Sequence, residues 1–148
     1  MKKILFILTT LMMLVAVSCK KDKKAIDYKA KVTGEWHCVP EEFEADIYAV
    51  FEEGGNFELY QQIGGGRHKH YSGTWAADKS TLSGTYSDGS AWGSTYRMEF
   101  SDDNTMTLTA LNGSEEIRIY IREEVPVEVK ESCIEAKSTA DTEYKPAF

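Results

Sequence analysis

The chain has 148 residues, of which 42% are hydrophobic and 28% are charged, and its formal net charge is −7. This length leaves room for one domain of ordinary size. From residue 32 onward, 22 acidic residues oppose nine basic ones, so that part of the chain carries a charge of −13. Because no basic stripe is available to meet phosphates, we expect no nucleic acid as a partner.

Residues 1–18 have the pattern of an export signal. Two lysines precede an apolar run that is long enough for a signal-peptide core and too short to span a bilayer comfortably. The run ends in Ala16-Val17-Ser18-Cys19, which resembles the lipobox of bacterial lipoproteins. The resemblance implies a lipoprotein signal peptide and a lipid anchor on Cys19, carrying acyl chains such as palmitate. A plain secreted protein that is cut elsewhere is the alternative.

Residues 19–31 are predicted to form a flexible basic tether behind the lipidated cysteine. From Lys20 to Lys31 six lysines oppose two aspartates, which gives a charge of +4, and few residues are apolar. Such a segment cannot bury enough surface to fold, and its charge suits anionic lipid headgroups. Lys20 stands where an Asp would resemble the inner-membrane retention signal of Gram-negative lipoproteins. We therefore expect an outer-membrane location, with the periplasmic and the cell-surface face both open.

From residue 32 onward, short segments of alternating apolar and polar residues are separated by turns. This alternation places the apolar side chains on one face of a β-strand. Asn112-Gly113 is the best single hairpin signal in the chain, and no convincing helix separates the strands. The eight expected strands lie at about residues 32–39, 47–51, 57–63, 69–76, 81–87, 96–100, 106–110 and 117–122.

The order of these strands predicts a closed meander. Residues 51–59 and 100–108 each read as strand, turn and strand, which supports a repeated hairpin. Hairpins in series with one apolar face remove their exposed edges most simply by closing into a barrel. We therefore predict an all-β fold, an eight-stranded antiparallel up-and-down barrel over residues 32–124. A two-sheet sandwich is the alternative.

Gly34-Glu35-Trp36, on the first expected strand, resembles the Gly-x-Trp signature that opens lipocalins. In that family the Trp closes one end of the barrel. The whole pattern is similar to the lipocalin-like domains of small bacterial lipoproteins, over about residues 32–124. This segment is shorter than a full lipocalin, and no clear helix precedes the tail. The resemblance therefore does not imply a large ligand cavity.

Residues 125–148 are predicted to be a C-terminal tail. We expect residues 125–129 to be extended because Pro126 opposes a helix, followed by a helical turn or two in residues 131–137. From residue 138 onward we expect little order.

Two cysteines remain inside the expected domain and tail once Cys19 is assigned to the lipid. Cys38 and Cys133 lie near the two ends of this part of the chain, and export permits a disulfide between them. Such a bridge would contribute on the order of 3 to 5 kcal/mol in the loop-entropy model. Two separate thiols, one of them buried, are the other reading, and both stay open from the sequence.

Aromatic residues are the clearest functional clue. Rings with gaps between them can hold a small apolar or aromatic ligand, although the same rings can fill a core. We expect most of them to fill the core and a shallow pocket at one mouth to bind the ligand. Trp92 lies in a turn and is expected to be exposed. The candidate ligand-binding residues are Trp36, Trp75, Tyr86, Trp92, Tyr96 and Phe100.

Two other classes of function have weaker support. His68 and His70 share a strand face and could ligate one metal ion, but no third ligand can be placed beside them. No nucleophile elbow or paired catalytic carboxylates stand out, so we expect neither an enzyme nor a cofactor. We expect a lipid-anchored binder of a small hydrophobic ligand. The alternative is a module that binds an envelope protein through loops 64–68 and 87–93 on a filled barrel.

Overall fold

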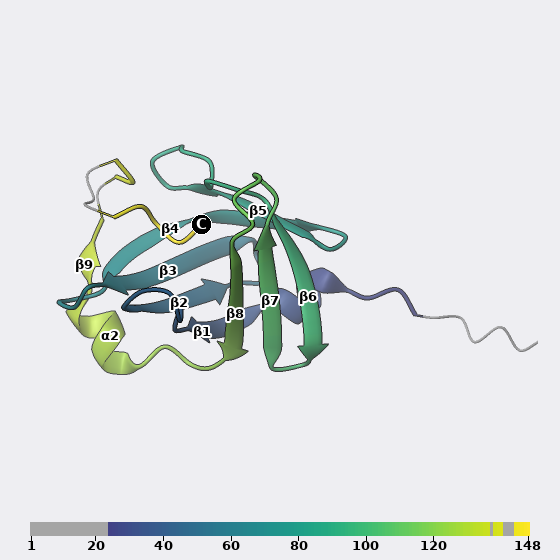
Figure 1. The fold of residues 1–148 in the computed structure, drawn as a ribbon, viewed down its shortest axis with the longest axis horizontal. Helices are drawn as coiled ribbons and strands as arrows, with labels where there is room; N and C mark the ends of the chain where they lie inside the picture. The colour runs from purple at the N-terminus through teal and green to yellow at the C-terminus, as the bar shows by residue number, and fades with distance from the viewer. Residues whose placement is uncertain (1–23, 137, 141–143) are drawn as a thin grey trace, which may run out of the picture.

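The computed structural model describes residues 24–136, 138–140 and 144–148 (Figure 1). The predicted signal peptide and Cys19 lie outside these residues. A short helix, α1 (Tyr28–Val32), comes first, and a second helix, α2 (Val127–Ser132), and strand β9 (Ile134–Glu135) follow the barrel. The barrel strands are β1 (Gly34–Cys38), β2 (Ala45–Phe51), β3 (Asn56–Ile63), β4 (Lys69–Asp78), β5 (Thr81–Tyr86), β6 (Tyr96–Asp102), β7 (Thr105–Ala110) and β8 (Ile117–Arg122).

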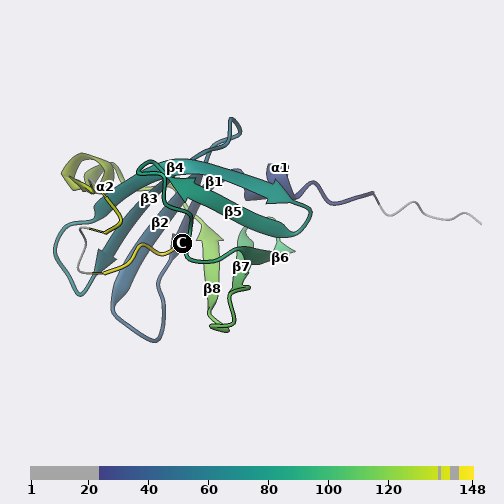
Figure 2. The same cartoon turned by 90° about the horizontal axis from the view of Figure 1, so that it is seen from above.

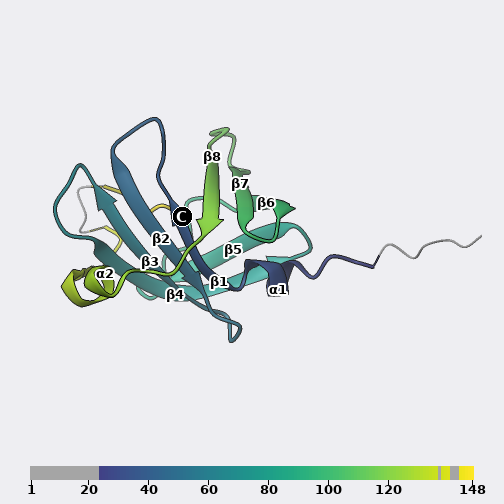
Figure 3. The same cartoon turned by 90° about the horizontal axis from the view of Figure 1, so that it is seen from below.

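Eight strands close into one barrel. Each strand from β1 to β8 pairs antiparallel with the next one, and β8 pairs antiparallel with β1. Trp36 faces Arg122 across this last seam. Figures 2 and 3 show β6, β7 and β8 standing across the curved layer that β1–β5 form. The predicted eight-stranded antiparallel barrel is confirmed, and the sandwich alternative is wrong because the hydrogen-bonded ladder returns to its first strand.

Side chains alternate between the interior and the solvent, as the sequence pattern predicts. In β7, Met106 and Leu108 are buried with at most 1% of their surface exposed. In β6, Arg97 and Glu99 face outward with about half or more of their side chains exposed. The buried set forms one continuous apolar cluster inside the barrel.

Strand β8 has the opposite facing from the one its hydropathy favours. Ile117, Ile119 and Ile121 are about half exposed, whereas Tyr120 is fully buried. The pairing with β7 decides this, because Tyr120 lies opposite Met106, whose side chain points inward. A register shifted by one residue would reverse every side chain of the strand.

Helix α1 closes one end of the barrel. The Asp27 side chain accepts a hydrogen bond from the Ala30 backbone N–H at 3.1 Å, and so caps the helix. Val32, the last helical residue, is fully buried. The expected strand at residues 32–39 therefore begins two residues later, and the predicted tether is helical near its end. Five residues are too few for a hydrophobic period to be visible in the sequence.

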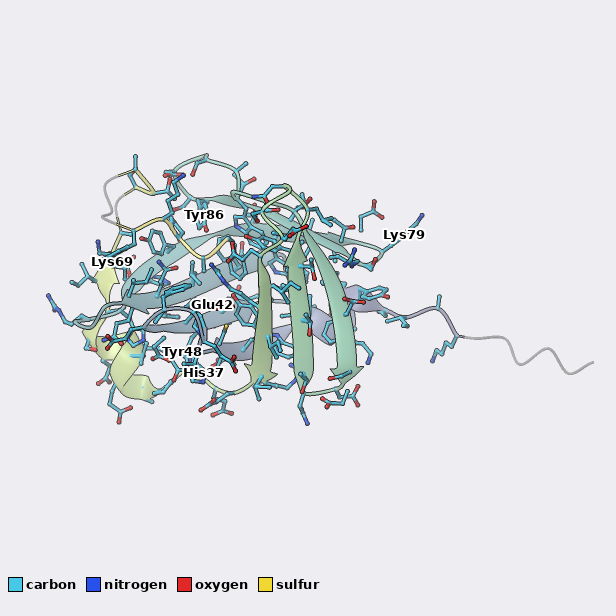
Figure 4. All side chains as sticks on the ribbon, in the orientation of Figure 1. His37, Glu42, Tyr48, Lys69, Lys79 and Tyr86 are labelled. Atoms are coloured by element: carbon cyan, nitrogen blue, oxygen red, sulfur yellow. The ribbon has the colours of Figure 1, made fainter. Side chains whose placement is uncertain are left out.

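The segment after β8 wraps the outside of the barrel. Residues 125–129 are not extended as predicted, because Pro126 sits just before α2, where its missing N–H is no penalty. Of the helical turns expected in residues 131–137, only residues 131 and 132 are helical, as the end of α2, and strand β9, which pairs parallel with β4, follows them. Helix α2 covers a small outer patch that contains Tyr48, Tyr60 and Val125. Tyr48 also stacks on His37, with ring centroids 4.2 Å apart (Figure 4).

Residues 144–148 return to the barrel. Little order was expected beyond residue 138, yet Ala147 and Phe148 are buried, with 6% and 4% of their surface exposed. Figures 2 and 3 place the end marked C between β8 and β2. This contact joins parts of the chain that are far apart in sequence, and therefore leaves no local pattern.

Candidate functional site

The candidate site is the mouth of the barrel at the end opposite to α1. Figure 4 labels Lys69 near this end, where β4 begins, and Lys79 at the closed end, beyond the last residue of β4. A cleft of about 510 Å³ lies at the mouth, and Tyr86, Tyr96 and Arg118 contribute to its walls. Residues 144–148 also line it.

Phe148 sits in a cage of aromatic rings at the base of this cleft. Its ring stacks on Trp92 with centroids 4.5 Å apart and planes inclined by 22°. Four more rings surround it at centroid distances of 5.8 to 6.3 Å, and they approach mostly by their edges or at a tilt. Aromatic pairs at these separations contribute about 0.5–1.5 kcal/mol each beyond burial of their area. The further rings are those of Phe51, Phe57, Tyr96 and Tyr120.

Three barrel side chains donate hydrogen bonds to backbone carbonyls beside this aromatic cage. The Tyr86 hydroxyl donates to the backbone carbonyl of Phe148 at 2.8 Å. Arg118 Nη1 and the Tyr96 hydroxyl both donate to the carbonyl of Ala147, at 2.6 and 3.3 Å. The mouth therefore combines an apolar cage with three hydrogen-bond donors, and these donors bind carbonyl oxygens beside the cage. Concave apolar sites with a few convergent polar groups are typical of ligand pockets.

Burial keeps the two tyrosine donors in their protonated forms. It raises the pKa of Tyr96 to about 12, with a further contribution from the negative charge of Glu116, and it also raises the pKa of Tyr86. Burial lowers the pKa of Arg118, but Tyr120 and Glu116 outweigh this effect and the net pKa is raised. At neutral pH the mouth therefore presents two hydroxyl donors and one guanidinium group, which also forms an ion pair with Glu116.

Trp92 is buried, whereas a position in a turn favoured an exposed side chain. Only 6% of its surface is exposed. The indole lies directly over Gly84, where a Cβ atom would stand 2.3 Å from Trp92 Cε2. Because Gly84 has no side chain, the loop between β5 and β6 can fold inward. Among the described residues the Trp92 Nε1–H has no hydrogen-bond acceptor.

The other three candidate aromatic residues lie toward the closed end. The Trp36 indole N–H donates to the carbonyl of Val32 at 2.7 Å, and the Arg122 guanidinium lies 4.2 Å from the Trp36 ring. Phe100 lies 6.2 Å from the Trp36 ring. The Trp75 indole N–H donates to a backbone carbonyl in the turn after β2, at 3.0 Å. The structure thus gathers Tyr86, Trp92 and Tyr96 at the mouth and separates them from the other candidates.

The two candidate metal ligands, His68 and His70, each contact a carboxylate. His68 Nε2 lies 2.8 Å from Asp46 Oδ2, and His70 Nδ1 lies 2.6 Å from Glu135 Oε1. Asp46 also contacts His37 Nε2 through its other oxygen, at 2.5 Å. No group of three or more His, Cys, Asp or Glu within residues 24–136, 138–140 and 144–148 is arranged to hold a metal ion.

Cys38 and Cys133 are both free thiols, so the structure contains no bridge between them. Cys38 belongs to the core inside the barrel, whereas Cys133 packs on the outer patch under α2, and the barrel wall separates them. Burial raises the pKa of Cys38 to about 11. In this structure the two thiols are separate, and that of Cys38 is buried.

Sequence reasoning missed two residues that build the mouth. Arg118 alternates with isoleucines and so reads as an outward-facing residue, but the register of β8 turns it inward. Gln61, on β3, donates from Nε2 to the carbonyl of Lys145 at 2.9 Å. The one signal in the sequence was that Gln61 is a polar residue on an otherwise apolar strand face.

Comparisons with known proteins found solved structures that are similar to this chain. An NMR structure of a protein from Bacteroides uniformis ATCC 8492 is similar at 11% identity and a TM-score of 0.50, and the match covers 66% of this chain and 93% of that one. A crystal structure of an uncharacterized protein from Bacteroides eggerthii DSM 20697 is similar at 16% identity and a TM-score of 0.46, covering 62% of this chain and 98% of that one. No curated protein matches the chain.

In the part of the chain that the structure describes, no helix is long and apolar enough to cross a membrane. The family model described as a lipocalin-like domain matches residues 18–108, which is more than half of the chain. Its extent includes β1 to most of β7 and therefore most of the closed barrel. The protein belongs to the family of lipocalin-like domains.

Proposed function

We propose that this protein binds a small hydrophobic ligand at the mouth of its barrel and does not transform it. The observation that carries the proposal is the environment of Phe148, which is an aromatic ring held by a cage of rings with hydrogen-bond donors beside it. In the described residues this place is filled by the chain itself. Phe148 and the carbonyls next to it therefore indicate what kind of group fits.

The ligand that suits this mouth has an aromatic or flat apolar group next to an acceptor oxygen. The ring would stack on Trp92, where Phe148 stacks now. A carbonyl or carboxylate oxygen would accept from Arg118, Tyr86 and Tyr96, as the backbone carbonyls do now. Hydrogen bonds to a charged donor contribute about 1.5–3 kcal/mol. Arg118 keeps an ion pair with Glu116 at the same mouth, so its free donor suits a neutral carbonyl as well as a carboxylate oxygen.

The proposed location follows from the sequence alone. We propose a lipid anchor at Cys19, with the basic tether at the membrane surface and the acidic barrel beyond it, in the outer membrane. A ligand-binding barrel held at a membrane meets hydrophobic molecules at the place where they partition.

A second candidate function is binding of an envelope protein. The row of Ile117, Ile119 and Ile121 on the outer face of β8 favours it, because each side chain is about half exposed and all three share one face. Loop 64–68 is exposed at its glycines. Loop 87–93 is a weaker candidate, because Trp92 turns inward.

The indole N–H signals of the three tryptophans test the ligand proposal. Isotope-labelled protein is titrated with anilinonaphthalenesulfonate, which carries aromatic rings and an anionic acceptor group, and two-dimensional NMR follows Trp36, Trp75 and Trp92. We expect a saturable shift of the Trp92 signal, because it lies at the mouth. The other two N–H groups are bonded to backbone carbonyls away from the mouth and act as internal controls.

Two results would contradict the proposal. One is a Trp92 signal that stays unchanged at millimolar probe. The other is a shift of equal size at all three indoles, which indicates binding without a site. A chain with Arg118→Gln should bind the probe about tenfold or more weakly, since one charge-assisted hydrogen bond is lost, whereas Arg97→Gln on the outer face should bind normally.

A further inference from the structure

Residues 144–148 occupy the mouth in the way that the proposed ligand would. We infer that this segment is a displaceable internal occupant of the site, so that it competes with the ligand and sets the apparent affinity. The inference rests on the proposed function above and adds its regulation. It names the competitor as a segment of this chain, with Phe148 as its anchor.

The direction of the hydrogen bonds supports displacement. Four hydrogen bonds, from Gln61, Tyr86, Tyr96 and Arg118, run from a barrel donor to a backbone carbonyl of the segment. Backbone carbonyls are common to all peptides, and other carbonyl or carboxylate oxygens accept in the same geometry. An incoming ligand can therefore accept from each donor without leaving a buried polar group unpaired.

The segment is also separate from the framework of the barrel. Residues 144–148 belong to no helix or strand, and β1–β8 close without them. Exposure falls along the segment from Tyr144, at 47%, to Phe148, at 4%, so one end is anchored and the other lies at the surface. Release of this anchor leaves every barrel ladder intact.

The site is larger than the group that fills it. A cleft of about 510 Å³ remains beside the segment, within the range of about 300–1,000 Å³ that ligand pockets span. Residues 144–148 form part of the cleft's lining and leave its volume open. The segment therefore does not use the whole site.

The size of the effect follows from the fraction of molecules in which the mouth is free. A tethered segment acts at an effective concentration in the millimolar range. If the mouth is free in about one molecule in ten, the apparent dissociation constant is raised about tenfold. Removal of the Phe148 ring should abolish this tenfold rise in the apparent dissociation constant.

The experiment compares three chains by the same NMR titration with anilinonaphthalenesulfonate. They are the intact chain, Phe148→Ala, and Ile119→Ala as a matched apolar truncation on the outer face. Phe148→Ala should bind the probe about tenfold more tightly than the intact chain, and Ile119→Ala should bind equally to it. A chain that lacks residues 144–148 keeps every barrel strand, and provides the same comparison if Phe148→Ala folds poorly.

A peptide added separately completes the test. Acetylated Tyr-Lys-Pro-Ala-Phe at millimolar concentration should lower the affinity of Phe148→Ala for the probe. Equal affinities of the intact, Phe148→Ala and deleted chains, with Trp92 still responding, would overturn the regulatory inference and leave the proposed function standing. A silent Trp92 in every chain would refute the proposed function itself.

Discussion

The contact between Gly84 and Trp92 yields the sharpest prediction about the mouth. In a Gly84→Ala chain, the new Cβ would lie 2.3 Å from Trp92 Cε2 and 2.7 Å from the backbone oxygen of Thr74. The oxygen belongs to a paired strand and cannot move far, so the indole must move. We therefore expect the loop that carries Trp92 to be pushed outward.

The loss of stability expected for Gly84→Ala has a lower and an upper bound. Overpacking a tight site costs typically about 1–3 kcal/mol, and complete loss of the packing of a buried Trp costs about 3–5 kcal/mol. We expect the free energy of unfolding to fall by about 3 kcal/mol, with a red shift of tryptophan emission. Urea unfolding followed by circular dichroism and by fluorescence measures both quantities.

Gly54→Ala is the matched control. An added Cβ at Gly54 would meet no atom within 4 Å, and this residue does not have a positive φ. Its free energy of unfolding should therefore stay within about 0.5 kcal/mol of the parent value. The reasoning is refuted if Gly84→Ala also stays within that range and its tryptophan emission is unchanged.

Three further outcomes are expected. Arg122→Gln should lower the free energy of unfolding by about 2–4 kcal/mol, because the guanidinium donates to three backbone carbonyls and covers a Trp ring. In the same urea melts, Arg97→Gln should leave the free energy of unfolding nearly unchanged. At pH 8, alkylation mapped by mass spectrometry should be at least about 100-fold slower at Cys38 than at a free thiol, because burial raises the pKa of Cys38 from 9.0 to about 11. Equal alkylation rates at Cys38 and Cys133 would contradict the burial of Cys38. Hydrogen bonds from Ser90 and Thr139 hold the pKa of Asp88 well below its usual range, so their stabilisation is present above about pH 4 and is lost as pH falls; the difference in Tm between Asp88→Asn and the parent should shrink at low pH.

The ligand cleft and the row of exposed isoleucines lie on opposite sides of the β8 wall, because successive residues of a strand point to opposite faces. Arg118 serves the mouth, while Ile117 and Ile119 face out on either side of it. Ligand binding and a protein contact can therefore be separated by single substitutions in one strand.

Local pattern determined most of the barrel. Alternation from Tyr96 to Phe100 and from Met106 to Ala110 predicts two strands, and the turns between expected strands are short. Antiparallel neighbours follow from such turns, and closure follows from the need to pair the edges. Asn112-Gly113 lies in the β7–β8 connection, where the hairpin signal predicts it. These features depend on neighbours within a few residues, and the sequence contains that information.

The tertiary structure alone decided how the mouth is built. The facing of β8 depends on its register with β7, which places Arg118 inside in spite of the isoleucines beside it. Trp92 is buried because Gly84, on another strand, leaves room for it. Phe148 reaches the cage from the far end of the chain. Each of these contacts joins residues whose side chains meet only after the barrel has closed, so no local periodicity can predict them.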